Sequence, residues 1–199
     1  MEMGITPVRT ATTREEGSNQ PQRASFSPSA DDIRAKACAI AFGNPLIENS
    51  YRGLIAEIIV GEALGAEWRL CSCDWKGWDF EHMAGTRLEV KQSAARQTWT
   101  GLRNATKPIF DVRARTGYFD GADWVSDARR FAEIYVFAHH PLMDETADHR
   151  DPLQWRFYVV PANRLPSSKT LSLAKIALLA EMVPWGALKA AVEGIRATL

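Results

Sequence analysis

Two apolar runs in the C-terminal half of the chain most constrain its fold. Residues Glu133–Ala138 and Trp155–Val160 are rich in β-branched and aromatic side chains, and the first run is nearly continuous in its apolarity. Such runs are typical of strands in the middle of a sheet, where both faces are covered. The chain is therefore expected to build a sheet with other elements packed on each side.

The segments around these runs predict an α/β fold. Ahead of them, the pattern predicts two helices and then three short strands, over residues 31–42, 45–65, 67–73, 78–81 and 87–93. Behind them, two C-terminal helices are expected over 172–182 and 185–198, separated at Pro184. Residues 94–130 have no clean period and are expected to form a long functional insertion, with a helix around 123–131. The expected architecture is a mixed central sheet flanked by helices.

The length of 199 residues suits one core better than two. Residues 1–30 are polar and poor in large apolar side chains, which predicts a disordered arm, whereas residues 31–199 are expected to form one folded domain. The sequence has no secretory leader pattern and no apolar run of membrane-spanning length. Its three cysteines, Cys38, Cys71 and Cys73, are expected to be free thiols. The chain is predicted to be cytoplasmic, with no membrane partner.

The stretch from Trp78 to Ser93 carries the strongest chemical signal. Residues two apart on a strand point to the same face, so Glu89, Lys91 and Ser93 are expected to share one face of the strand over 87–93. Asp79 belongs to the preceding strand across a short turn, which would bring its carboxylate beside Glu89. Two neighbouring carboxylates repel each other unless positive charge lies between them. A divalent cation and the Lys91 ammonium would supply that charge.

This combination suits phosphodiester hydrolysis. Hard oxygen ligands favour Mg²⁺, which polarises a phosphoryl oxygen and lowers the pKa of a bound water. Mn²⁺ is the alternative ion. Lys91 is predicted to orient the attacking water or to offset charge that develops on the phosphate.

Asp79, nine intervening residues and then Glu89-Val90-Lys91 resemble the D…(D/E)-x-K signature of the PD-(D/E)XK nuclease superfamily, which is restriction endonuclease-like. Trp78 stands where the family name has proline. The resemblance implies an αβββαβ core and a metal held by Asp79, Glu89 and the Val90 carbonyl. It also implies a DNA substrate and a restriction, repair or mobile-element role.

The helix before these strands offers a fourth acid. In many members of the superfamily a glutamate on the first core helix completes the acidic cluster, and Glu57 is the candidate. Gly53, Glu57 and Gly61 are four residues apart, so they lie on one stripe of the helix. Small residues beside a glutamate would let this stripe approach the sheet closely. The alternative interpretation is that Glu57 lies on the solvated face of the helix. Arg52, on the same helix, is a candidate for phosphate contact.

Basic residues concentrate after the strand that carries Glu89. The whole chain is neutral, with 24 basic and 24 acidic residues, but the segment 87–115 has seven basic against two acidic residues, a net charge of +5. This distribution predicts a nucleic-acid contact surface, with Trp99 as a stacking platform. The other predicted substrate-binding residues are Gln92, Ser93, Arg96, Arg103 and Lys107.

The sequence leaves several alternatives open. The chain could be a catalytically silent DNA-binding or protein-interaction subunit that keeps the nuclease fold. It could also be another metal-dependent phosphoesterase or an RNA-processing nuclease. His139, His140 and His149 match no zinc-binding spacing and are better explained as loop residues. A homodimer, which many such enzymes form to cut both strands, is also left open.

Overall fold

A computed structural model describes residues 27–72, 76–101 and 105–199 of the chain. Its α-helices are α1 (Ala30–Phe42), α2 (Asn49–Leu64), α3 (Leu173–Ile176) and α4 (Leu188–Arg196). Its strands are β1 (Trp68–Leu70), β2 (Phe80–His82), β3 (Arg87–Ala94), β4 (Ile109–Asp111), β5 (Arg115–Asp120), β6 (Asp123–Arg129), β7 (Ile134–His140), β8 (Arg156–Pro161), β9 (Thr170–Ser172) and β10 (Met182–Val183). Most of the predicted N-terminal arm lies outside the described residues, as do Cys73 and Arg103.

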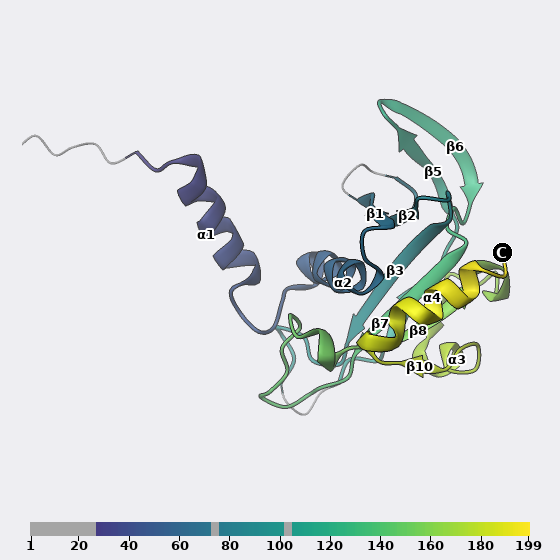
Figure 1. The fold of residues 1–199 in the computed structure, drawn as a ribbon. Helices are drawn as coiled ribbons and strands as arrows, with labels where there is room; N and C mark the ends of the chain where they lie inside the picture. Colours follow the sequence, from purple (N-terminus) through teal and green to yellow (C-terminus); the bar gives the residue numbers. More distant parts are fainter. Residues whose placement is uncertain (1–26, 73–75, 102–104) are drawn as a thin grey trace, which may run out of the picture.

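A mixed six-stranded sheet forms the centre of the fold, in the order β1-β2-β3-β7-β8-β10 (Figure 1). β3 runs parallel to β7, and the other pairings in this sheet are antiparallel. Every residue of β7 is buried. The two apolar runs that predicted central strands are thus β7 and β8, side by side, and the prediction of a mixed sheet with flanking helices is confirmed.

Each face of the sheet has its own apolar core. On one face, α2 and α4 pack against the side chains of β3, β7 and β8 that include Leu88, Val90 and Val136 (Figure 1). On the opposite face, Tyr135, Phe137 and neighbouring side chains pack against β4, β9 and α3. Alternation along β3 therefore sends Leu88 and Val90 toward α2, as strand geometry predicts, and sends Glu89 toward the other face.

Helix α2 approaches the sheet closely at one of its two stripe glycines. A Cβ atom built on Gly61 would lie 3.1 Å from the ring of Phe80 on β2, whereas one built on Gly53 would meet only the end of the Glu57 side chain, at 4.0 Å. Gly61 therefore allows the close approach that the stripe predicted. Gly53 has open space around it, so the prediction is wrong there.

The predicted helix around 123–131 is wrong. Residues 123–129 form β6, which pairs antiparallel with β5 in a hairpin that projects beyond the central sheet (Figure 1). Its register joins Asp120 to Asp123 across Gly121 and Ala122, and Gly121 has a φ of 61°. In the αβββαβ order a helix stands between the third and fourth core strands, and the described part of this connection holds only strands. That specific order is therefore not confirmed.

The helix ends also differ from prediction. Ser29, and not Asp31 or Asp32, caps α1, because its side chain accepts from the Asp32 backbone while the Asp32 side chain accepts from the Ser29 backbone. The expected helix over 172–182 is a single turn, α3, followed by the sheet strand β10. β10 pairs with β8 at the edge of the sheet, and this tertiary pairing overrides the local helical pattern there.

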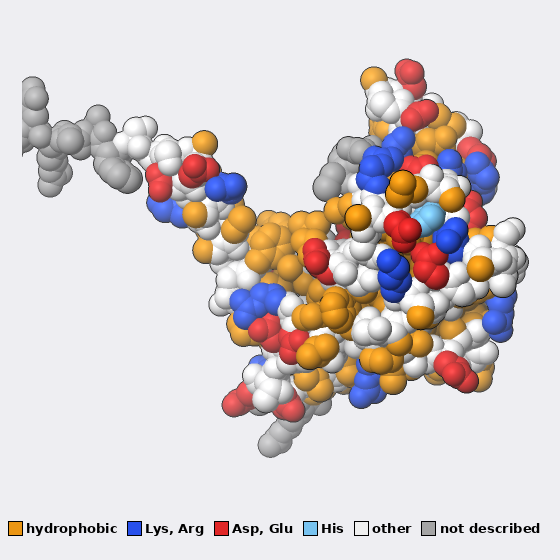
Figure 2. Space-filling view, viewed as in Figure 1, with side chains coloured by type: hydrophobic (Ala, Val, Ile, Leu, Met, Phe, Trp, Pro, Cys, Tyr) orange, Lys and Arg blue, Asp and Glu red, His pale blue; other side chains and the backbone are white. Residues whose placement is uncertain are grey.

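Helix α1 projects away from the rest of the molecule (Figure 1) and has no buried residue. Ile33 and Ile40 are exposed on it. On the body, hydrophobic side chains gather on the face next to α1 (Figure 2), and Tyr51 and Ile58 of α2 are exposed as well.

Candidate active site

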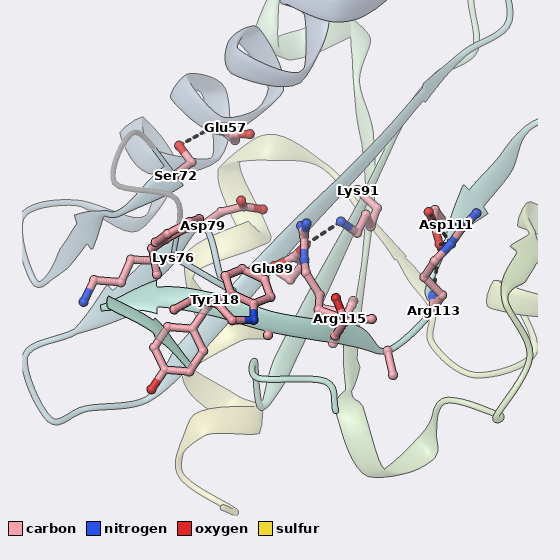
Figure 3. Close-up of a pocket in the computed structure, with 16 residues that line it drawn as sticks. Glu57, Ser72, Lys76, Asp79, Glu89, Lys91, Asp111, Arg113, Arg115 and Tyr118 are labelled. Carbon is pink, nitrogen blue, oxygen red and sulfur yellow. Dashed lines mark hydrogen bonds and ion pairs between the residues drawn. The ribbon is translucent and has the colours of Figure 1, made fainter. Parts of the chain in front are cut away.

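One open cavity of about 800 Å³ brings together four residues that the sequence singled out: Glu57, Asp79, Glu89 and Lys91. Glu57 comes from α2, Asp79 from the residue directly before β2, and Glu89 and Lys91 from β3 (Figure 3). The hairpin β5–β6 and the segment before it complete the walls.

Glu89 lies at the bottom of this cavity because it is on the inward face of a central strand. Its side chain is only 3% exposed, and its neighbour in the parallel register on β7 is Tyr135, which also lines the cavity. One Glu89 oxygen, Oε1, accepts from both the Lys91 ammonium and the Arg115 guanidinium, the latter at 2.8 Å. The other oxygen, Oε2, is buried and has no hydrogen-bond partner.

Hydrogen bonds to β3 place Asp79. Phe80 pairs with Leu88 in the register of β2 and β3, yet the Asp79 N–H also donates to the Leu88 carbonyl, at 3.0 Å. The Asp79 backbone, directly ahead of β2, is thus attached to β3. The Asp79 carboxylate also accepts from the backbone N–H of Val90 at 2.7 Å. These two contacts hold Asp79 against the strand that carries Glu89 and Lys91.

The electrostatics of Asp79 show how closely the acids are gathered. Burial, followed by the charges of Glu89 and Glu57, raises the pKa of Asp79 to about 8, although Lys91 and the Val90 N–H act in the opposite direction. A carboxyl group with this pKa is largely protonated at neutral pH. Burial and the two neighbouring acids thus both disfavour the charged form of Asp79.

Glu57 is half-buried and faces the cavity, so the solvated-face interpretation does not hold in this structure. Its Oε2 accepts from the Ser72 hydroxyl at 2.7 Å (Figure 3). This contact joins α2 to the segment after β1 and holds the Glu57 carboxylate near Asp79, whose pKa it raises.

The acids fit a divalent cation by their chemistry, without forming a ready-made cluster. No group of three or more His, Cys, Asp or Glu side chains close enough to hold a metal ion occurs among residues 27–72, 76–101 and 105–199. Each carboxylate instead has a partner on the protein: Ser72, Val90, or Lys91 with Arg115. Glu89 Oε2 nevertheless has no hydrogen-bond partner, and the raised pKa of Asp79 means that its ionised form is disfavoured. A bound cation would stabilise the negative charge of both carboxylates.

Arg52 and Gln92 form a network behind the catalytic strand. Gln92 faces α2, and its Oε1 accepts from Arg52 Nε at 2.7 Å. The buried guanidinium also donates to Gln97 Oε1 at 2.7 Å and to Asn49 Oδ1 at 2.6 Å. Arg52 therefore ties α2 to the end of β3 in this structure and does not face the cavity. Ser93 is buried on the Glu89 face, and neither it nor Gln92 lines the cavity.

The other predicted substrate contacts lie outside the cavity lining. Arg96 donates to the carbonyl of Asp144, while Trp99 and Lys107 are exposed, Trp99 at 66%. All three come after the end of β3, whereas Glu89 lies near its middle. Their roles remain predictions, and the structure does not bring them to the acids.

Several cavity residues were not predicted as site residues, and they share polar or aromatic side chains: Ser72, Lys76, Asp111, Arg113, Arg115 and Tyr118. Arg113 and Arg115 entered the sequence analysis only through the charge of their segment. A stronger signal was Asp120-Gly121 between Phe119 and Trp124, because Asp-Gly flanked by apolar residues is typical of a hairpin turn.

Comparison with protein-family models gives no match, and comparison with curated protein sequences gives none either. The family resemblance therefore rests on the residues themselves. Among the helices of the described residues, none has the length and apolarity needed to cross a lipid bilayer.

Proposed function

We propose that this protein is a metal-dependent nuclease that hydrolyses phosphodiester bonds, with DNA as its substrate and with Asp79, Glu89 and Lys91 at its centre. The observation that carries the proposal is the shared cavity in which these three residues meet Glu57. Three acids and an ammonium group around one recess are the side chains that cation-assisted phosphoryl transfer requires.

Asp79 and Glu89 would hold a divalent cation, Mg²⁺ or Mn²⁺, with Glu57 as a further acid and the Val90 carbonyl as the ligand implied by the family resemblance. When bound, the ion supplies a Lewis acid that polarises the phosphate and lowers the pKa of water. The hydrogen bond that the Val90 N–H donates to Asp79 Oδ2 fixes the orientation of this carboxylate. Lys91 would orient the attacking water or offset charge on the phosphate.

The cavity also offers groups for a phosphate backbone. Lys76, Arg113 and Arg115 line it, and basic side chains gather around the hairpin on the visible face (Figure 2). Arg115 is bound to Glu89 Oε1, so a cation that takes over Glu89 would free this guanidinium for a phosphate oxygen. These residues are better placed than Arg96 and Lys107 to contact a strand at the acids.

The test is cleavage of plasmid, linear duplex and single-stranded DNA with Mg²⁺ or with EDTA. Parent protein is expected to cut only with the ion, and Asp79→Ala is expected to lose at least about a hundredfold in rate. Glu81→Ala is the matched control, because Glu81 lies two residues away on β2, pairs with Arg69 and does not line the cavity. Equal cleavage by parent and Asp79→Ala would overturn the proposal.

The second candidate is a catalytically silent nucleic-acid-binding subunit. The observation in its favour is that every carboxylate of the site has a partner on the protein within the described residues. This candidate predicts DNA binding that EDTA does not weaken, together with no cleavage of DNA or RNA in Mg²⁺ or Mn²⁺.

A further inference from the structure

The hairpin β5–β6 presents two aromatic side chains at the cavity. Phe119 and Trp124 are directly opposite each other in the hairpin register, so they lie on the same face of it. Their rings are in edge contact, with centroids 5.1 Å apart. Both line the cavity, and both remain exposed, Trp124 at 51% and Phe119 at 37%.

The backbone of the hairpin is shaped around the Trp124 ring. A Cβ atom on Gly117 would lie 2.6 Å from the indole and 2.3 Å from the Val125 carbonyl, so only glycine fits there. The indole therefore lies against the strand opposite, where its orientation is fixed although half of its surface is open. A fixed, exposed ring is a surface on which another flat ring can stack.

The other face of the hairpin attaches it to the body. Tyr118 packs against Trp78, with ring centroids 5.5 Å apart, and against Phe131 at 4.9 Å. Near the tip, Lys76 pairs with Asp120 at 3.2 Å. The aromatic pair is thus held at the cavity by contacts that do not involve its exposed face.

The recessed position of the acids limits what can reach them. Glu89 is at the bottom of a cavity of about 800 Å³, a volume within the range of sites that enclose small ligands. One or two nucleotides fit such a volume, whereas a turn of duplex is far larger. A single strand that enters this recess can therefore bring its phosphate to Glu89 and Lys91.

We propose that Phe119 and Trp124 form a stacking platform for an unpaired nucleobase next to the phosphate that is cut. The inference rests on the proposed function and specifies its substrate class: single-stranded DNA, including the single-stranded parts of flaps and frayed ends. Aromatic rings beside a basic groove are the combination by which proteins hold single strands without reading sequence. Lys76, Arg113 and Arg115 supply the basic groove here.

The experiment measures binding in EDTA, so it does not depend on cleavage. Fluorescence anisotropy at fixed salt compares a short labelled single strand of DNA, the same strand with abasic sites in place of bases, and a blunt duplex. The parent is expected to bind the single strand at least tenfold more tightly than the duplex. Trp124→Ala is expected to weaken single-strand binding about tenfold while abasic binding stays unchanged.

Two further variants guard against misfolding. Trp124→Phe keeps an aromatic ring and should retain most of the affinity. Leu178→Ala is the control, because Leu178 is a large apolar side chain that is 83% exposed and lies outside the cavity lining, and it should bind as the parent does. An equal loss on the abasic strand, no loss with Trp124→Ala, or tighter binding of the blunt duplex would each overturn the platform. Tenfold tighter binding of an RNA strand of the same sequence would overturn the assignment to DNA.

The outcomes for the two proposals are separable. If the parent binds single strands through Trp124 but cuts nothing with Mg²⁺, the nuclease proposal fails and the platform stands. If cleavage depends on Mg²⁺ and Asp79 but binding is insensitive to Trp124, the nuclease proposal stands and the platform fails.

Discussion

Asp79 is a carboxyl group that the fold keeps buried next to two other acids, and burial is the largest reason that its pKa rises to about 8. In the unfolded chain it ionises near pH 4. Its contribution to stability is therefore present below about pH 4 and is lost as the pH rises through 8. Without divalent cations, Asp79→Asn is expected to be more stable than the parent at pH 8 by at least about 1 kcal/mol, with a smaller gain at pH 5.

Thermal unfolding in EDTA across this pH range measures the difference. Asparagine can still accept from the Val90 N–H, so the substitution removes charge and leaves that contact available. Glu81→Gln serves as the control and should show no such gain, because Glu81 is paired with Arg69 at the surface. A variant that loses stability at every pH would contradict the described electrostatics. Added Mg²⁺ should raise the melting temperature of the parent and not of Asp79→Asn.

Lys91 is the residue whose removal tests the proposed chemistry most directly. Lys91→Ala is expected to reduce the single-turnover cleavage rate by about a hundredfold or more, because a positive charge beside the acids is lost. Lys175→Ala, which removes an exposed lysine from α3, should leave the rate unchanged. Cleavage by Lys91→Ala at the parental rate would argue against the assigned role.

At the scale of elements, the sequence was most informative where burial and local pattern agree. β7 and β8 were predictable because nearly every residue in them is apolar. Both strands of the hairpin, β5 and β6, bury few of their own residues, so neither shows a strong alternation of apolar and polar positions. For this reason β6 was not predicted as a strand. β10 was missed for a different reason: Met182 and Val183 become a strand only by pairing with β8, which is a tertiary effect.

The two stripe glycines of α2 allow a matched test of helix packing. Gly53→Ala is expected to stabilise the protein by about 0.5–1 kcal/mol, because alanine favours the helix and nothing obstructs its Cβ. At Gly61 the same gain is opposed by contact with the buried Phe80 ring, so Gly61→Ala should be less stable than Gly53→Ala by about 1 kcal/mol or more. Urea unfolding of both variants decides this, and equal stabilisation would show that α2 has more room than described.

Across the whole molecule, the candidate site divides into a part that sequence could predict and a part that it could not. Asp79, Glu89 and Lys91 are close along the chain, so strand alternation alone relates them. Arg115 and Trp124 come to the cavity through the placement of the hairpin, and no local pattern encodes that placement. Trp99 and Lys107 belong to the same basic segment as Arg113 and Arg115 but do not line the cavity, so their predicted contact with substrate stays a prediction.

His149 connects distant parts of the molecule and makes its stability depend on pH. Its Nδ1 accepts from the Ile47 N–H at 3.0 Å, and its Nε2 lies 3.2 Å from the Arg96 carbonyl. Burial, followed by the charges of His140 and Arg52, lowers the pKa of His149 to about 4. The stability that this neutral ring provides is complete above pH 6.5 and is lost as the pH falls toward 4.

When the pH falls from 7 to 4.5, the free energy of unfolding should therefore decrease less in His149→Gln than in the parent, by roughly 2 kcal/mol. Glutamine can accept and donate hydrogen bonds but cannot take up a proton in this range. Chemical denaturation at the two pH values gives the comparison. Parallel losses in the parent and the variant would show that another group controls the acid sensitivity.

The parallel pairing of β3 with β7 has a consequence for how the protein is made. Glu89 and Lys91 are synthesised early, but the strand beside them ends at His140, and the hairpin that supplies Arg115 lies between the two. Pairings between distant segments form slowly and only after the intervening chain exists. During synthesis on the ribosome, Glu89 and Lys91 are therefore present before the strand that pairs with β3. The cavity can form around them only once residue 140 has left the exit tunnel.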